Sequence, residues 1–308
     1  MDRNENLYLK SGIIMQKIAE ALLFIEIGER IPRVGDLSSE FNVGRGTIQT
    51  ILKKLEDLDC IKLESRGHLG TFLKRKNINN LLNYSGISQV TAVMPLPYSK
   101  KYEGLATGLT YEFEQLNLSF NIAFMIGDKL RLNGLKEGRY DLALVSRFSA
   151  LEELKNRSEL SVALDFGVQT YVSNHAIIFS DPSKTTITDG MKIGIDDCST
   201  DQVTLTNAET EEKKVEYVKL NYMHLLPHLS ANNIDATIWS IDEIDKNHFH
   251  TQPLSSAKAI QYEKEMSQAV CLIQKENKKM EYILSLLSKE KIVKIQSLVE
   301  EGNFIPRY

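Results

Sequence analysis

The sequence predicts a multi-domain chain, with a small N-terminal α+β domain followed by a larger α/β domain of two lobes. Two short helices and a glycine-containing hairpin follow one another within residues 31–73, whereas strands and helices alternate from about residue 88 onward. At 308 residues the chain is long enough for two domains with separate hydrophobic cores. We expect these domains at residues 1–75 and 89–308, joined by a polar linker at residues 76–88.

Two short helices joined by a tight turn are predicted before residue 58, after a first helix from Ser11 to Glu26. Val34, Leu37 and Phe41 have helical spacing, and Asn42 ends that helix. In the next helix apolar residues recur at i, i+3, i+4 and i+7, so its other face is polar and basic. The apolar stripe comprises Ile48, Ile51, Leu52 and Leu55.

A β-hairpin is expected next, because the short β-like runs at 61–63 and 71–73 flank a turn that contains Gly67 and Gly70. Two short helices followed by such a hairpin form a winged helix-turn-helix, whose second helix lies in the major groove of DNA. The residues expected to contact DNA are Arg33, Arg45, Thr47, Gln49, Thr50, Lys53, Arg66 and His68.

Spacing alone also fits a small helical subdomain with an appended hairpin and no role in DNA binding. The motifs resemble those of GntR-type bacterial transcription regulators over roughly residues 8–75. Val43–Ile48 resembles the turn and the start of the recognition helix, Leu52–Glu56 the LxxLE run, and Gly70–Phe72 the end of the wing. The resemblance implies binding to a double-stranded DNA operator.

Three features depart from the GntR pattern. Gly44 stands where Ser is usual, Gln49 stands where Arg is usual, and the wing has an extra residue around His68. The amide of Gln49 can pair with adenine, whereas Arg would favour guanine. The resemblance therefore does not predict the operator sequence.

Charge differs between the two predicted domains. Residues 1–76 contain 13 Lys+Arg and 11 Asp+Glu, a net charge of +2, whereas the remainder contains 24 and 30, a net charge of -6. Positive charge thus lies on the part expected to meet phosphate. No apolar run approaches a membrane span, no signal-peptide pattern is present, and the three cysteines are far apart. We expect a cytoplasmic protein without a membrane partner.

Alternating strands and helices predict two α/β lobes with parallel sheets and a cleft between them. In the first lobe the strands are expected at 90–96, 118–125 and 141–145, and in the second at 191–195, 215–220 and 234–239. The run at 268–273 is expected to rejoin the first lobe. This arrangement resembles the periplasmic-binding-protein type 2 fold, used as an effector domain in cytoplasmic regulators. Together with the N-terminal motifs, it resembles the YhfZ-type transcription regulators.

Ligands of α/β sheets bind at the carboxyl ends of strands and in clefts. Arg147 can hold a carboxylate or phosphate, and Ser199 and Thr200 at a helix start can donate to an anion. Structural alternatives remain open: Ser199 as a plain helix cap, Arg147 in a surface ion pair, and Trp239 in the core. The expected ligand-binding residues are Pro97, Tyr98, Ser146, Arg147, Ser199, Thr200, Trp239 and Asp242, which suit a small-molecule effector and an anionic one in particular.

An enzyme on the same fold is a further alternative. Cys198 lies in a turn before a helix, where a thiolate is stabilised. The histidines have neither metal-site nor triad spacing, and a fused DNA-binding domain argues against catalysis. We expect no catalytic residue, no metal and no cofactor.

The sequence thus predicts a DNA-binding transcription regulator controlled by a small molecule bound in the C-terminal cleft. A homodimer is expected, because two small DNA-binding heads on spaced half-sites multiply specificity. The main alternative is a small-molecule-binding α/β protein without DNA-binding activity.

Overall fold

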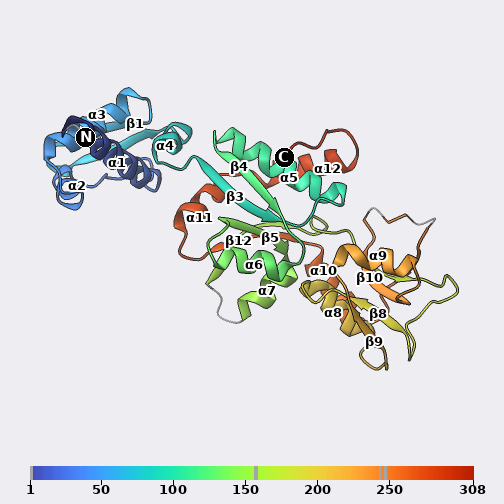
Figure 1. The fold of residues 1–308 in the computed structure, drawn as a ribbon. Coiled ribbons are helices and arrows are strands. Elements are labelled where there is room, and N and C mark those ends of the chain that lie inside the picture. The colour runs from blue at the N-terminus through green and yellow to red at the C-terminus, as the bar shows by residue number, and fades with distance from the viewer. Residues whose placement is uncertain (1–2, 156–158, 243, 246–247) are drawn as a thin grey trace. The chain divides into compact units, whose positions relative to one another are not determined.

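The computed structural model describes residues 3–155, 159–242, 244–245 and 248–308, with the backbone alone for residues 3–10. Contacts divide the chain into two compact units (Figure 1). The N-terminal unit comprises Met1–Val90 with Phe113–Phe120, and the C-terminal unit comprises Thr91–Glu112 with Asn121–Tyr308. Within the described residues, no helix combines the length and the apolarity needed to cross a bilayer.

The N-terminal unit contains the helix-turn-helix and the wing. Its elements are α1 (Arg3–Leu23), α2 (Val34–Glu40), α3 (Arg45–Asp57), β1 (Ile61–Ser65), the 3-10 turn η1 (Gly67–Leu69), β2 (Thr71–Lys76) and α4 (Ile78–Tyr84). β1 and β2 pair antiparallel and form the wing. The apolar stripe of α3 is buried, together with Ile18 and Leu22 of α1 and Leu73 of β2. One core therefore holds α1, α3 and the wing together.

Two elements of this unit differ from the sequence prediction. Helix α1 begins at Arg3 rather than Ser11 and ends at Leu23 rather than Glu26, and the Lys76 ammonium donates to the carbonyls of Leu23 and Ile25 at this end. The predicted linker at 76–88 contains helix α4. Its composition is polar, but Leu81 and Leu82 are fully buried and anchor it.

The first lobe is a five-stranded sheet in the order β4-β3-β5-β12-β6. Its strands are β3 (Gln89–Met94), β4 (Ser119–Phe124), β5 (Leu142–Ser146), β6 (Leu160–Gly167) and β12 (Ala269–Gln274). Its helices are α5 (Lys100–Gln115), α6 (Asp128–Lys136), α7 (Arg147–Lys155), α11 (Lys278–Ser285) and α12 (Lys289–Glu300). β12 rejoins this lobe as predicted, but it runs antiparallel to β5 and β6, so the sheet is mixed.

The second lobe is also a mixed sheet, in the order β11-β7-β10-β8-β9. Its strands are β7 (His175–Phe179), β8 (Lys192–Ile195), β9 (Glu216–Lys219), β10 (Ala236–Ser240) and β11 (His250–Pro253). Its helices are α8 (Thr200–Glu209), α9 (Tyr222–Ser230) and α10 (Ala257–Met266). β8 is parallel to β9 and β10, whereas β7 is antiparallel to β10 and β11. The chain therefore has the predicted class, an N-terminal helix-turn-helix and a C-terminal two-lobed α/β domain.

Candidate functional site

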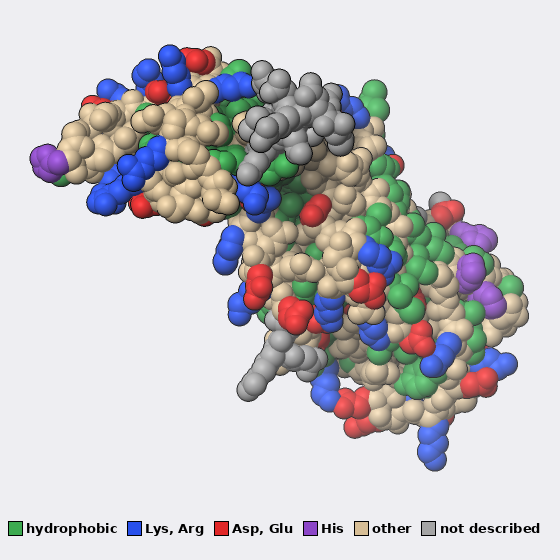
Figure 2. Space-filling view, turned by 60° about the vertical axis from the view of Figure 1, so that its left-hand side comes forward, with side chains coloured by type: hydrophobic (Ala, Val, Ile, Leu, Met, Phe, Trp, Pro, Cys, Tyr) green, Lys and Arg blue, Asp and Glu red, His purple; other side chains and the backbone are tan. Residues whose placement is uncertain are grey.

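The outer face of α3 is the candidate DNA-binding surface. Arg45, Gln49, Thr50 and Lys53 are exposed on it, and Thr47 is half-buried, while the opposite apolar stripe fills the core. The Thr50 hydroxyl donates to the Gly46 carbonyl at 2.9 Å. Figure 2 shows Lys and Arg side chains standing out on the N-terminal unit. The helix thus presents a polar, basic face of the kind that enters a major groove.

The wing carries less free charge than its sequence suggests. The Arg66 guanidinium donates to the Glu64 carboxylate at 2.7 Å and lies 4.4 Å from the centre of the Phe72 ring. This pairing lowers the pKa of Glu64. His68 is exposed in the turn at the tip of the wing. A side chain that we did not predict, Arg30, packs against the backbone of Gly70.

Arg33 and Arg45 flank the start of α2. Arg33 is exposed at the residue before the helix, and the Arg45 guanidinium lies over Gly35, 3.6 Å from where a Cβ would stand. The Arg45 side chain therefore lies beside the first turn of α2.

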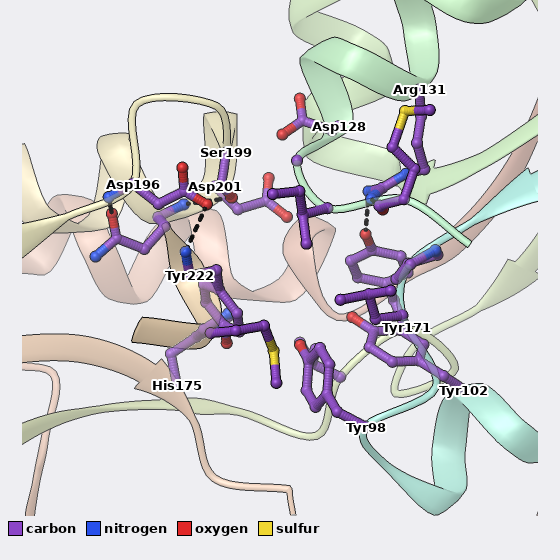
Figure 3. A pocket seen from close by; sticks show the side chains of 18 residues that line it. Tyr98, Tyr102, Asp128, Arg131, Tyr171, His175, Asp196, Ser199, Asp201 and Tyr222 are labelled. Atoms are coloured by element: carbon purple, nitrogen blue, oxygen red, sulfur yellow. Dashed lines mark hydrogen bonds between the residues drawn. The ribbon is translucent and has the colours of Figure 1, made fainter. Parts of the chain in front are cut away.

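The C-terminal unit contains a cavity of about 60 Å³ between its two lobes. By the same measure one water needs roughly 10–15 Å³, so the cavity suits a small metabolite. Figure 3 shows the side chains that surround it. They belong to Pro95, Leu96, Tyr98, Tyr102, Met125, Ile126, Gly127, Asp128, Arg131, Tyr171, Val172, His175, Asp196, Ser199, Asp201, Gln202, Tyr222 and Met223.

The structure brings two of the eight predicted ligand residues, Tyr98 and Ser199, to this cavity. The Ser199 hydroxyl accepts from the Gln202 N–H, as a helix cap does. Arg147 pairs with Asp165, which matches its surface alternative. Pro97 does not line the cavity.

The other four predicted residues lie in the surrounding structure. Trp239 is 5% exposed and stacks on Tyr222 at 3.8 Å between ring centres, so it supports a cavity residue from the core. Asp242 accepts from the Ser173 N–H and the Ser240 hydroxyl. The remaining two, Ser146 and Thr200, donate to carboxylates of the cavity wall.

Asp201, in the first turn of α8, is a buried carboxylate that the sequence analysis missed. Its Oδ1 accepts from the hydroxyls of Ser146, at 2.8 Å, and Ser149, at 2.9 Å. Burial, followed by the charge of Asp128, raises the pKa of Asp201 to about 7. Since Asp201 directly follows the predicted pair Ser199 and Thr200, its place in the first turn of that helix was the available signal.

Two further carboxylates occupy helix N-termini at the cavity. Asp128 Oδ1 accepts the Thr200 N–H of α8 at 2.7 Å, and Asp196 Oδ2 accepts the Tyr222 N–H of α9 at 3.2 Å. Burial raises the pKa of Asp196, although the backbone N–H groups of Cys198 and Tyr222 donate to its carboxylate. Asp128 Oδ2 is enclosed and has no hydrogen-bond partner among the described residues. These acids fill the places where helix N-termini attract anions.

Four tyrosines also line the cavity (Figure 3). The ring centre of Tyr98 lies 5.2 Å from that of Tyr102 and 5.7 Å from that of Tyr222. The ring centre of Tyr102 lies 5.2 Å from that of Tyr171. Burial raises the pKa of all four phenols, that of Tyr98 to about 12. The cavity therefore offers neutral phenols and ring faces.

Arg131 of α6 is the buried cation of the wall, 3% exposed. Its guanidinium donates to the carbonyls of Leu144 and Met125 and to the Tyr171 hydroxyl, at 3.1, 2.8 and 2.9 Å. Three of its five N–H groups are thus bound to the protein. Tyr171 lies in a loop where no sequence pattern pointed to a ligand site.

His175, the first residue of β7, also lines the cavity. Burial lowers its pKa to about 4, so the imidazole is neutral at physiological pH. Its Nδ1 is enclosed without a hydrogen-bond partner among the described residues. Cys198, the candidate nucleophile of the enzyme alternative, has a raised pKa because of partial burial and the charges of Asp196 and Asp197. Its thiol therefore lacks the acidity of a reactive cysteine.

Comparison with known proteins identifies both halves of the chain. Residues 77–308 match the YhfZ C-terminal domain, and residues 26–73 match a helix-turn-helix domain. The YhfZ protein of Escherichia coli strain K12 is 30% identical over 303 residues, which cover 97% of this chain and 98% of that protein.

Solved structures resemble the larger part of the chain. The crystal structure of YhfZ from Shigella flexneri aligns with a TM-score of 0.61 and 30% identity, over 75% of this chain and 97% of that one. The periplasmic aliphatic sulphonate binding protein of Escherichia coli aligns with a TM-score of 0.51 and 12% identity, over 70% of this chain and 75% of that one. The second likeness shows a shared fold alone.

Proposed function

The chain belongs to the YhfZ family, and on that premise we propose that it is a sequence-specific transcription regulator controlled by a small molecule. It has a helix-turn-helix domain and a two-lobed domain that resembles periplasmic binding proteins. The observation that carries the proposal is the exposed polar face of α3, in one chain with a lobed domain that encloses a cavity.

In this proposal α3 enters the major groove and the wing lies along the backbone. Arg45 and Gln49 reach base edges, while Lys53 and Arg33 contact phosphates. The motifs Val43–Ile48 and Gly70–Phe72 support assignment to the GntR type. Arg66 contributes less than an unpaired arginine, because Glu64 neutralises part of its charge.

We further propose that the protein acts as a cytoplasmic homodimer. One head contacts few base pairs, and two heads on spaced half-sites provide the specificity that a regulator needs. A protein that reads chromosomal DNA works where that DNA is, which is the basis for placing it in the cytoplasm.

The small molecule is proposed to bind between the two lobes and to change DNA affinity. Such control requires that the ligand bind two states of the protein with different affinity. The wall contains residues from both lobes, so a ligand there contacts both at once. We propose no catalytic step, and the raised pKa of Cys198 supports this view.

Fluorescence anisotropy with DNA from the region upstream of the gene tests the proposal. Arg45→Ala should weaken binding about 5- to 150-fold, because one good base contact contributes about 1–3 kcal/mol. Arg139→Ala removes an equal charge from an exposed, Glu137-paired arginine of the C-terminal unit and should leave the affinity unchanged.

Two results would contradict the DNA-binding proposal. One is equal affinity of the wild type and the Arg45→Ala variant. The other is absence of binding at 50 mM salt, where phosphate contacts are strong. If the wild type fails to bind DNA but still binds small molecules, the chain is a ligand-binding module without DNA-binding activity.

A further inference from the structure

The charges around the cavity indicate which chemical class of ligand it takes. Its wall contains the carboxylates of Asp128, Asp196 and Asp201, against the guanidinium of Arg131. The helix N-termini at which an anionic ligand would bind are already occupied, because Thr200 and Tyr222 donate their backbone N–H groups to Asp128 and Asp196. An anion entering the cavity would meet protein carboxylates instead of free donors.

Asp201 is the carboxylate best placed to receive a ligand. The two hydroxyls that donate to Asp201, those of Ser146 and Ser149, both bind Oδ1, and none of the described residues donates to Oδ2. The residue is 8% exposed and borders the cavity. Unlike the enclosed Oδ2 of Asp128, this oxygen can be reached by a ligand, and a positively charged donor from a ligand can pair with it.

The aromatic side of the cavity suits the same charge. Figure 3 shows the rings of Tyr98, Tyr102 and Tyr171 on the side away from Asp196 and Asp201, and Tyr222 beside Asp196. Ring faces attract ammonium groups, and the attraction is strongest where water is excluded. Because the phenols remain neutral, they compensate no charge of the acids.

Arg131 favours the ionised form of Asp201 through its charge, but no hydrogen bond joins the two side chains among the described contacts. Its guanidinium is held by the carbonyls of Leu144 and Met125 and by the Tyr171 hydroxyl. The two N–H groups that remain can still bind a carboxylate of a ligand that also carries an amine.

We propose that the cavity binds a small molecule through a protonated amine, which pairs with Asp201 and is enclosed by the tyrosine rings. The proposal deepens the function proposed above, since it takes the cavity as the effector site. It makes Asp201 the residue that selects a cation over neutral and anionic molecules of the same size.

Ionisation of Asp201 links the binding of an amine to pH. The pKa of Asp201 is raised by the charge of Asp128 and lowered by the charge of Arg131. The charge of Asp201 in turn raises the pKa of Tyr171. The empty site holds a proton on Asp201 below about pH 7, and an ammonium group must displace that proton. Affinity for an amine therefore rises from pH 6 to pH 8, whereas affinity for an amide of the same shape stays constant.

The test uses three small probes of similar size: n-propylammonium, propionamide and propionate. Ligand-observed NMR with the full chain at constant ionic strength gives the three dissociation constants at pH 8. We expect n-propylammonium to bind at least tenfold more tightly than the other two probes. Asp201→Asn should abolish this preference, while replacement of an exposed acid of the loop before α8, Asp197→Asn, should keep it.

Propionate binding most tightly, or a tenfold preference that survives in Asp201→Asn, overturns the proposal. Should the Asn variant fail to fold, the wild-type pH series decides: amine affinity that does not rise between pH 6 and pH 8 overturns the proposal as well. The assay contains no DNA. Failure of the proposed regulator function and failure of amine binding are therefore separate results.

Discussion

Replacing Asp201 with Asn should stabilise the C-terminal unit at alkaline pH. Burial raises the pKa of this carboxyl from 3.8 to about 7 in the folded state. Because the folded-state pKa lies above the unfolded value, folding loses stability as the pH rises from about 4 to about 7. The difference between the two pKa values corresponds to about 4 kcal/mol, at 1.36 kcal/mol per pH unit, and we take this as an upper bound.

Asparagine avoids this cost, because it carries no charge and keeps an oxygen that can accept from Ser146 and Ser149. The expected gain in the free energy of unfolding is about 2–4 kcal/mol at pH 8 and about 2 kcal/mol or less at pH 5. Urea unfolding followed by the fluorescence of Trp239 measures it. Trp239 is the single Trp of the chain and lies in β10, so its signal reports the C-terminal unit alone.

Asp197→Asn is the matched control. Asp197 lies on the loop before α8, more than half exposed and paired with Lys219, so its replacement should change stability by about 0.5 kcal/mol or less at either pH. The reasoning is refuted if Asp201→Asn is no more stable than the wild type at pH 8. In that case ionisation of the buried Asp201 carboxyl would not lower the free energy of unfolding.

Three further predictions follow from particular contacts. Gly127→Ala should destabilise the C-terminal unit by about 2 kcal/mol or more in urea unfolding. Gly127 has a φ of 67°, and an added Cβ would lie 2.6 Å from the Cys198 carbonyl oxygen. An unchanged urea midpoint would contradict this prediction. Leu55→Ala should destabilise the N-terminal unit by about 2–5 kcal/mol in circular dichroism melts, since Leu55 is fully buried, and loss of less than about 1 kcal/mol would show that it is not a core residue. Cys198 should react with iodoacetamide at pH 7 more slowly than a cysteine in an unfolded peptide, because its pKa is raised, and mass spectrometry locates the label; faster reaction refutes that environment.

The N-terminal unit was the more predictable half, because its signals are local. The apolar period of α3 and the glycines of the wing determine both the element and its exposed face. Helix α4 was missed, since a polar, Asn-rich stretch hides the two leucines that pack. Strand β7 was missed because its pairing with β10 joins residues about 60 positions apart, which periodicity does not show.

The cavity was predictable only in part. Position after a strand correctly placed Tyr98 and Ser199 at the cavity. Arg147, chosen in the same way, pairs with an acid on the surface, and Trp239 is buried in the core. Tyr171 comes from a loop and Asp201 from within a helix, and they reach the cavity only through the packing of the lobes. Sequence position gives the edge of a sheet, whereas the direction of each side chain depends on tertiary contacts.

The most direct measurement is the dissociation constant for the upstream DNA with and without a bound amine. The amine is the one that gives the largest thermal shift with the wild type and none with Asp201→Asn. Control by the cavity predicts that this amine changes the DNA dissociation constant about 5- to 150-fold, a coupling free energy of about 1–3 kcal/mol. Equal dissociation constants at saturating amine would contradict the account.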